Sequence, residues 1–205
     1  LGQFNLRLTQ LPDNLLRGMS LLGHLRLLPG SRILTFLLDR FQGAGSAHVL
    51  GRINQFLHDD LHAGRFVTFV VGLLDGARHE IDLLSAGHGP LLVYRAAAGT
   101  VDSLHAHGAP LAVMEDVVFD GGDRVRLEPG DFIMLVTDGF YEWRNPTGEQ
   151  FGMDRINRSL VKHAEASAAA IIAQLYREVR EFTAGTAQAD DVTALVVKRE
   201  ASGGT

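Results

Sequence analysis

Cysteine is absent from the 205 residues of this sequence. Without thiols the chain can form no disulfide bond, no thiolate metal site and no cysteine nucleophile, and the absence fits a protein of a reducing compartment. A strong excess of charge of one sign is also missing, because 19 lysine and arginine residues stand against 24 aspartate and glutamate residues. The composition therefore gives no indication of a nucleic-acid-binding surface.

Long apolar runs are missing as well. The leucine-rich segment from Leu15 to Leu38 is interrupted by arginines, a histidine and the Pro29-Gly30 pair. A membrane-spanning helix needs about 20 consecutive, mostly apolar residues, and a secretory signal needs an unbroken apolar region. We therefore expect a cytoplasmic protein without a membrane contact.

The length and the 46% share of hydrophobic residues suit one globular domain with a substantial core. We expect this domain at residues 31–199, followed by a polar tail at residues 200–205. Residues 1–30 are fragmentary, because Pro12, Gly18 and Gly23 interrupt their leucines before any period is established. We interpret them as a linker or as incomplete first strands.

Hydrophobic periodicity predicts helices at both ends of the domain and strands in its middle. Apolar residues at helical spacing predict a hairpin of two helices, from Ser31 to Phe41 and from Ser46 to Leu61. Two further helices and a last strand are expected near the C-terminus. The order of elements predicts two sheets with helices outside them. The later helices are expected at Met153–His163 and Ser167–Phe182, and the strands at Phe66–Leu74, Glu80–Ser85, Leu91–Tyr94, Val101–Leu104, Leu111–Met114, Arg124–Leu127, Phe132–Thr137 and Val192–Val197.

Two acidic motifs border predicted strands. Asp138 and Gly139 follow a strongly apolar strand, and Asp190 and Asp191 precede the last one. If the two strands are neighbours, their carboxylates meet at one sheet edge. Oxygen ligands of this kind suit Mg²⁺ or Mn²⁺, and two such ions can activate a water for attack on phosphorus. The alternative is that Asp-Gly is only a turn and that Asp-Asp caps a strand in solvent.

The ordered set of motifs resembles the PPM (protein phosphatase 2C-like) serine/threonine phosphatases, and specifically their bacterial SpoIIE-type branch. The similarity covers about residues 46–199, and the ordered set is specific even though each motif alone is weak. It rests on Gly130-Asp131, Thr137-Asp138-Gly139, Glu142, Asn145, Gly148-Glu149, Phe151-Gly152, Ala189 to Thr193, the Phe66–Leu74 strand and the loop from Ala86 to Pro90.

This resemblance implies an α+β fold, a four-layer αββα sandwich with two central antiparallel sheets. It implies hydrolysis of phosphoserine or phosphothreonine on a signalling protein, with Mn²⁺ or Mg²⁺ as cofactor and a metal-activated water as nucleophile. Asp138 and Asp190 match metal aspartates of the family and are the expected catalytic pair. Asp191 matches a metal-site position at which relatives also carry asparagine, and Gly139 would let the backbone turn tightly beside the ions.

Three other residues are candidates for a substrate surface. His88 could approach a phosphate, Trp143 could line the surface, and Arg144 could grip a phosphate with two hydrogen bonds. The structural alternatives are a Gly-Pro turn around His88, packing of Trp143 over the sheet edge and a solvated Arg144. By the same resemblance, the partner would be a phosphoprotein such as an anti-sigma factor antagonist. The apolar hairpin of residues 31–61 would either pack in the core or form the interface of a homodimer.

The sequence departs from the family in one respect. Upstream of the first long helix, family members carry two glycine-aspartate motifs whose aspartates bridge both metals. Before residue 60 this chain has only Asp13, Asp39 and Asp59, and none of them stands in such a motif. Without a bridging carboxylate, Asp138 and Asp190 would hold at most one ion. Either the sequence omits segments between about residues 6 and 31, or the domain is a degenerate pseudophosphatase that binds a partner as a signalling module.

Overall fold

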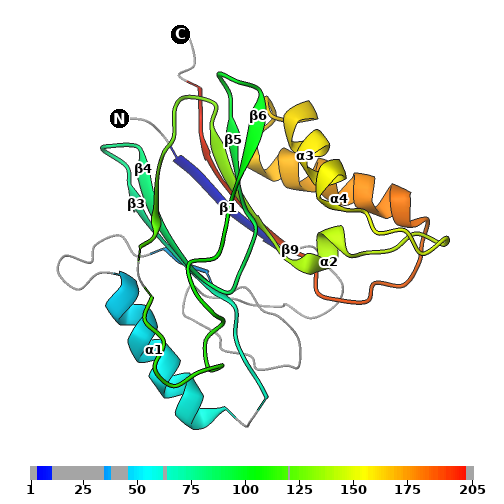
Figure 1. The fold of residues 1–205 in the computed structure, drawn as a ribbon. Helices are drawn as coiled ribbons and strands as arrows, with labels where there is room; N and C mark the ends of the chain where they lie inside the picture. The colour runs from blue at the N-terminus through cyan, green and yellow to red at the C-terminus, as the bar shows by residue number, and fades with distance from the viewer. Residues whose placement is uncertain (1–3, 11–34, 38–45, 62–63, 120, 202–205) are drawn as a thin grey trace.

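The computed structural model describes residues 4–10, 35–37, 46–61, 64–119 and 121–201, and within them two sheets lie between layers of helices (Figure 1). The five-stranded sheet has the order β1-β9-β8-β5-β6, and the four-stranded sheet has the order β2-β3-β4-β7. The strands are β1 Phe4–Gln10, β2 Thr35–Leu37, β3 Phe69–Asp75, β4 Glu80–Ala86, β5 Leu91–Arg95, β6 Thr100–Leu104, β7 Asp123–Arg126, β8 Phe132–Val136 and β9 Thr193–Arg199. The helices are α1 Ser46–Asp60, α2 Asp138–Tyr141, α3 Met153–Lys162 and α4 Ala168–Thr183.

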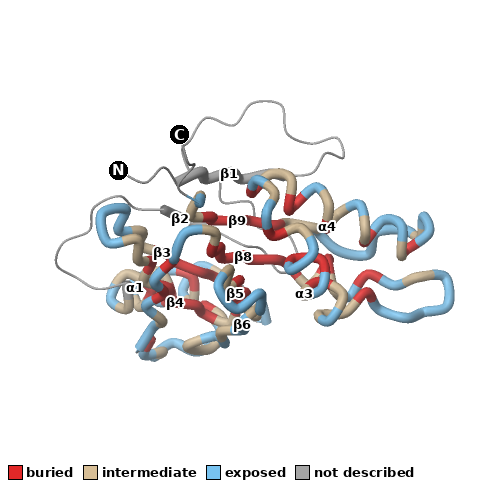
Figure 2. The backbone as a smooth tube through the Cα atoms, turned by 90° about the horizontal axis from the view of Figure 1, so that it is seen from above, coloured by how far each residue is buried: buried red, intermediate tan, exposed pale blue. Residues whose placement is uncertain are grey.

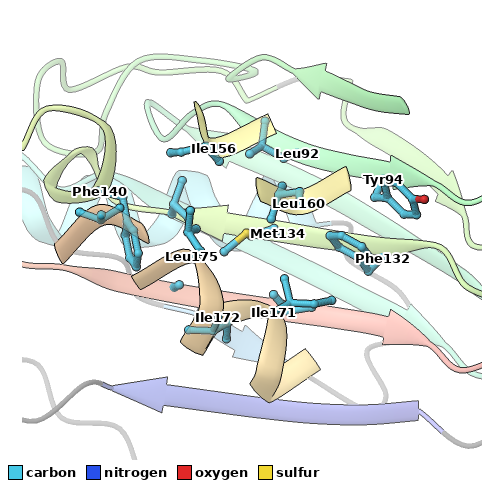
Figure 3. Packing of buried hydrophobic residues seen from close by; sticks show 14 of the residues in the cluster. Leu92, Tyr94, Phe132, Met134, Phe140, Ile156, Leu160, Ile171, Ile172 and Leu175 are labelled. Atoms are coloured by element: carbon cyan, nitrogen blue, oxygen red, sulfur yellow. The ribbon is translucent and has the colours of Figure 1, made fainter. Parts of the chain in front are cut away.

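Strand β8 illustrates how the layers are held together, because all of its residues are buried. Successive side chains of a strand point to opposite faces. Phe132 and Met134 therefore pack against α3 and α4, together with Leu160 and Ile171 (Figure 3). Ile133 belongs to a second cluster, which fills the space between the two sheets. A strand that is buried on both faces is the environment that its continuous apolar sequence predicts.

Helix α1 covers the outer face of the four-stranded sheet. Leu50 and Leu57 pack in one cluster with Phe69 of β3 and Leu84 of β4. The buried residues follow the strands, while the outer faces of the helices are exposed (Figure 2). The layers are thus α1, the four-stranded sheet, the five-stranded sheet, and α3 with α4, which confirms the expected αββα sandwich.

Asn54 links α1 to the loop that precedes β7. This side chain is only 1% exposed. Its Nδ2 donates to the carbonyl oxygens of Met114 and Glu115, both at 2.9 Å, and its Oδ1 accepts from the N–H of Ala112 at 2.8 Å. A single buried amide therefore satisfies three backbone groups of a loop that has no regular structure of its own.

The predicted helices and strands from Ser46 onward are confirmed with small shifts of their ends, with one exception. Leu111 forms only an isolated bridge to Val67, so the predicted strand Leu111–Met114 is wrong. The predicted helix Ser31–Phe41 is wrong over Thr35–Leu37, which form β2 and pair in parallel with β3. Pairing with the sheet satisfies backbone groups that a helix would satisfy internally. The rest of that predicted helix lies outside the described residues, as does most of residues 1–30.

None of the helices in the described ranges is long and apolar enough to cross a membrane. Strand β1 pairs with β9 along its whole length, from Phe4 opposite Arg199 to Gln10 opposite Thr193. Strand β9 also pairs with β8, with Val136 opposite Ala194. The antiparallel pairing of β8 and β9 brings the end of one strand next to the beginning of the other.

Candidate functional site

Thr137 joins the two acidic motifs at this sheet edge. Its side chain is buried, and its Oγ1 donates to the carbonyl oxygen of Asp191 at 2.8 Å and accepts from the N–H of Thr193 at 2.9 Å. The N–H of Thr137 donates to the carbonyl oxygen of Thr193 at 3.0 Å. These bonds fix the backbone that carries Asp138 against the backbone that carries Asp190 and Asp191. This role of Thr137 does not follow from the sequence pattern, although a threonine stands in each of the two motifs.

Gly139 allows an unusually close approach of the same two segments. A Cβ atom at this position would lie 2.4 Å from the carbonyl oxygen of Asp191, 2.9 Å from its carbonyl carbon and 3.3 Å from the carbonyl oxygen of Asp190. The obstacle is backbone rather than a flexible side chain, so a larger residue would have to displace it. Only glycine therefore fits this contact without displacement.

The carboxylates of the two motifs are oriented by their own backbone. Asp138 is half-buried at the first position of α2, and its Oδ1 accepts from the N–H of Gly139 at 3.0 Å. Asp190 is exposed, and its Oδ1 accepts from the N–H of Asp191 at 2.7 Å. Gln188 donates from Nε2 to the carbonyl oxygen of Asp190 at 2.8 Å, which fixes the segment before β9. Asp191 is also exposed.

The residue types of this site suit Mg²⁺ or Mn²⁺, which prefer oxygen ligands. The ligand set is nevertheless short, because the described residues contain no group of three or more histidine, aspartate or glutamate side chains placed to hold a metal ion. Asp138 and Asp190 therefore stay predicted ligands, and two carboxylates are too few for a complete metal site. The described part of the chain does not by itself form the two-metal centre that the family resemblance implies.

His88 lies in the loop between β4 and β5 and is only 7% exposed. The loop is tightly held: the N–H of His88 donates to Oγ of Ser85 at 3.2 Å, and the N–H of Gly87 donates to the carbonyl oxygen of Gly108 at 2.8 Å. Burial lowers the pKa of His88, and the nearby negative charge of Asp138 opposes this effect without cancelling it. A neutral imidazole is therefore expected at pH 7, and its Nε2 has no hydrogen-bond partner among the described residues.

Tyr141, at the end of α2, is also affected by the charge of Asp138. Burial raises the pKa of its phenol, and the charges of Asp138 and Glu142 raise it further. The side chain therefore remains a neutral hydroxyl through the physiological pH range.

A groove of about 510 Å³ begins at the acidic motifs. One wall is the loop of residues 142–150, and the other is the segment of residues 186–190. Gly139 and Asp190 line it together with Trp143 and Arg144, whereas His88 does not. Arg144 is exposed, and Trp143 is 4% exposed and packs in the core cluster of α3 and α4. The structure therefore brings four of the seven candidate site residues to one groove, whose second wall, residues 186–189, was not predicted from the sequence.

Comparison with protein families gives one match over most of the chain. The family model described as Stage II sporulation protein E (SpoIIE) matches residues 31–200. Phosphoserine phosphatase RsbU of Bacillus subtilis is 27% identical over 158 residues, which are 77% of this chain and 46% of RsbU. Protein IcfG of Synechocystis sp. is 28% identical over 142 residues, which are 69% of this chain and 22% of IcfG. The chain thus spans less than half the length of these curated relatives.

Solved structures agree with the fold described above. The SiaA-PP2C domain of Pseudomonas aeruginosa has a TM-score of 0.62 at 22% identity, covering 74% of this chain and 59% of that domain. A structure with the PP2C phosphatase domain and a regulatory fragment of SpoIIE from Bacillus subtilis has a TM-score of 0.61 at 20% identity, covering 76% of this chain and 44% of that one. At these identities the similarity establishes the fold.

Proposed function

Because this chain belongs to the SpoIIE family of PP2C-type phosphatases, we propose that it is a metal-dependent protein phosphatase acting on phosphoserine or phosphothreonine of a signalling protein. The observation that carries the proposal is the junction of the two acidic motifs. Thr137 forms hydrogen bonds across the junction to the backbone of Asp191 and Thr193, and Gly139 leaves room for the backbone of Asp190 and Asp191. If Asp138-Gly139 were only a turn and Asp190-Asp191 only a strand cap in solvent, this close contact between distant parts of the sequence would not be required.

Asp138 and Asp190 are the proposed ligands of Mn²⁺ or Mg²⁺ and the proposed catalytic residues, and Asp191 is a further proposed metal-site residue. Two solved relatives support this choice of metals, since one SpoIIE phosphatase domain was presoaked with Mn and RsbX was crystallised in complex with magnesium. When bound, such an ion supplies positive charge to a phosphoryl oxygen. The described residues do not complete the ligand set, so we derive no catalytic step through the metal.

The proposed substrate surface comprises His88, Trp143 and Arg144. Arg144 donates from Nη1 to the carbonyl oxygen of Gly148 at 2.7 Å, which orients its guanidinium at the groove. Two relatives are phosphoserine phosphatases by name, RsbU and RsbP of Bacillus subtilis, and they support a phosphorylated protein as substrate. We further propose that the substrate is an anti-sigma factor antagonist, that the protein is cytoplasmic and that it forms a homodimer.

The decisive test is turnover of a phosphoserine protein and of an aryl phosphate by the full chain with millimolar Mn²⁺. We expect activity that Asp138→Asn reduces by about 100-fold or more, since removal of a charge-stabilising group costs about 2.7–4 kcal/mol in other active sites. Asp116→Asn, an exposed aspartate far along the chain from the site, is the matched control and should retain wild-type activity. Undetectable turnover by the wild-type chain would contradict the proposal.

A second candidate function is a pseudophosphatase that binds a partner as a signalling module. The observation in its favour is the absence of a three-ligand group among the described residues. Isothermal titration calorimetry separates the two functions. The pseudophosphatase should release no heat of binding with Mn²⁺, whereas two tightly bound ions would exclude it.

A further inference from the structure

We infer that the groove between residues 142–150 and 186–190 binds an extended polypeptide segment of the substrate, next to its phosphorylated side chain. This inference rests on the proposed function and extends it from the phosphate to the flanking residues. Gly139 and Asp190 belong both to the acidic junction and to the lining of the groove. A chain whose phosphoserine reaches that junction therefore has its neighbouring residues at the groove.

The two walls of the groove are joined to each other. Thr186 donates from Oγ1 to the carbonyl oxygen of Arg144 at 2.6 Å, which connects the walls directly. In Figure 1 the corresponding loops run side by side beyond α2. Within the first wall, Oδ1 of Asn145 accepts from the N–H groups of Thr147 at 3.1 Å and Glu149 at 2.9 Å. A groove that is already ordered loses less conformational entropy when a flexible peptide binds.

The lining matches a mostly apolar stretch of polypeptide with one carbonyl or carboxylate acceptor near Arg144. Charged residues of the lining are Glu142, Arg144 and Asp190, and Arg144 is the cation among them. One N–H of Arg144 is used by Gly148, and within the described residues its guanidinium forms no ion pair, so its other N–H groups can meet a peptide carbonyl or carboxylate. The lining also contains residues without charge that suit an apolar side chain of the peptide. These are Trp143, Pro146, Gly148, Ala187 and Ala189.

The exposed second wall of the groove suits an extended peptide. The small side chains of Ala187 and Ala189 leave the backbone of the second wall accessible, because both residues are exposed. An extended main chain can therefore lie along this wall and direct a side chain toward Pro146 and Trp143.

The test compares two phosphoserine peptides with the same central sequence. The short peptide ends beside the phosphoserine, and the long one continues on both sides with apolar residues and one glutamate. We expect the wild-type chain to prefer the long peptide by about tenfold in kcat/KM, equivalent to one charge-assisted hydrogen bond with its apolar contacts. Ala187→Trp, which fills the groove, should abolish this preference, and Arg144→Ala should reduce it.

Arg158→Ala is the matched control, because this exposed arginine of α3 does not line the groove and should leave the preference unchanged. Circular dichroism of each variant reports whether it is folded. The ratio of the kcat/KM values for the two peptides does not depend on the amount of active protein. Equal preference in wild type and Ala187→Trp would overturn the inference.

A binding measurement separates this inference from the proposed function. If the wild-type chain hydrolyses neither peptide, the proposed activity fails. Fluorescence anisotropy of the labelled long peptide then tests the groove alone. Binding that Ala187→Trp weakens by about tenfold supports the groove, as expected for a filled hot-spot pocket. Binding that is absent, or equal in both proteins, overturns it.

Discussion

Individual residues decide whether the acidic motifs can meet. Asp138 follows β8 and Asp190 precedes β9, and these two strands are neighbours in the sheet. Neighbouring strands alone do not bring their flanking segments into contact. Thr137 bridges the backbone of both segments, and Gly139 removes the side chain that would separate them. Two residues without ionisable side chains therefore determine the geometry of the ionisable ones.

Gly139→Ala tests this contact. The new methyl group must displace the carbonyl of Asp191, which would lie 2.4 Å away, so we expect a loss of about 1–3 kcal/mol in the free energy of unfolding. A displacement of about 1 Å at a reacting centre can cost about 100-fold in rate, and we expect a loss of that order in phosphatase activity. Urea unfolding and steady-state kinetics measure the two effects.

Gly99→Ala, in the turn between β5 and β6 and outside the groove, is a useful control for Gly139→Ala. A Cβ atom at Gly99 would meet no atom within 4 Å, although its positive φ of 66° makes the substitution strained. The control therefore reports backbone strain without a steric clash at the acidic junction. Equal activity loss in both variants would contradict the role assigned to the close approach at Gly139.

At the scale of elements, the sequence predicts what depends on local pattern. Strand β8 was predicted because it is a continuous apolar run, and α4 was predicted because Ser167 and the apolar spacing of Ile171, Leu175 and Val179 define its start and inner face. Strand β2 was missed because its pairing with β3 is a tertiary contact. The groove was missed for the same reason, since its walls come from loops that are distant in the sequence.

Asn54 tests how α1 positions a neighbouring loop. Asn54→Leu would leave three partly buried backbone groups of residues 112–115 without their partner, and we expect a loss of about 1–3 kcal/mol in the free energy of unfolding. The exposed neighbour Gln55→Leu is the matched control. If the free energy of unfolding of Asn54→Leu in urea differed from wild type by less than about 0.5 kcal/mol, the role of Asn54 would be contradicted, since that is the usual range of surface substitutions.

Helices α3 and α4 are joined by Glu178, which accepts hydrogen bonds from Lys162 at 2.7 Å and from His163 at 3.0 Å. Burial raises the pKa of Glu178, but the hydrogen bonds outweigh this effect and lower it from 4.5 to about 2. A depressed pKa in the folded state means that the bonds stabilise the protein above pH 4.5 and that this stabilisation is lost as the pH falls toward 2.

The expected result for Glu178→Gln is a free energy of unfolding that is lower than wild type at pH 7, with a difference that shrinks as the pH falls from 4.5 toward 2. Chemical unfolding at a series of pH values measures the difference. Glu181→Gln is the control, because its partner Arg177 lies 3.8 Å away and both side chains are largely exposed. A difference that does not change over this pH range would contradict the linkage.

At the scale of the whole molecule, any metal ion that binds the folded chain also changes its stability. An ion that binds only the folded state stabilises it by about 2.7 kcal/mol at a concentration 100 times its Kd. For a phosphatase we therefore expect Mn²⁺ to raise the melting temperature of the full chain, and we expect Asp138→Asn to abolish the rise. Asp116→Asn should keep it, and an unchanged melting temperature of the wild-type chain in Mn²⁺ would favour the pseudophosphatase.

The position of β9 has a consequence for how the protein forms. Strand β9 lies between β1 and β8, so one of its edges pairs with the first described strand, which lies more than 180 residues earlier in the sequence (Figure 1). Pairing between residues so distant in sequence must overcome a large loop-closure entropy and slows folding. On the ribosome, the acidic junction cannot assemble until synthesis has passed residue 193, so a nascent chain lacks the proposed metal site while most of its domain already exists.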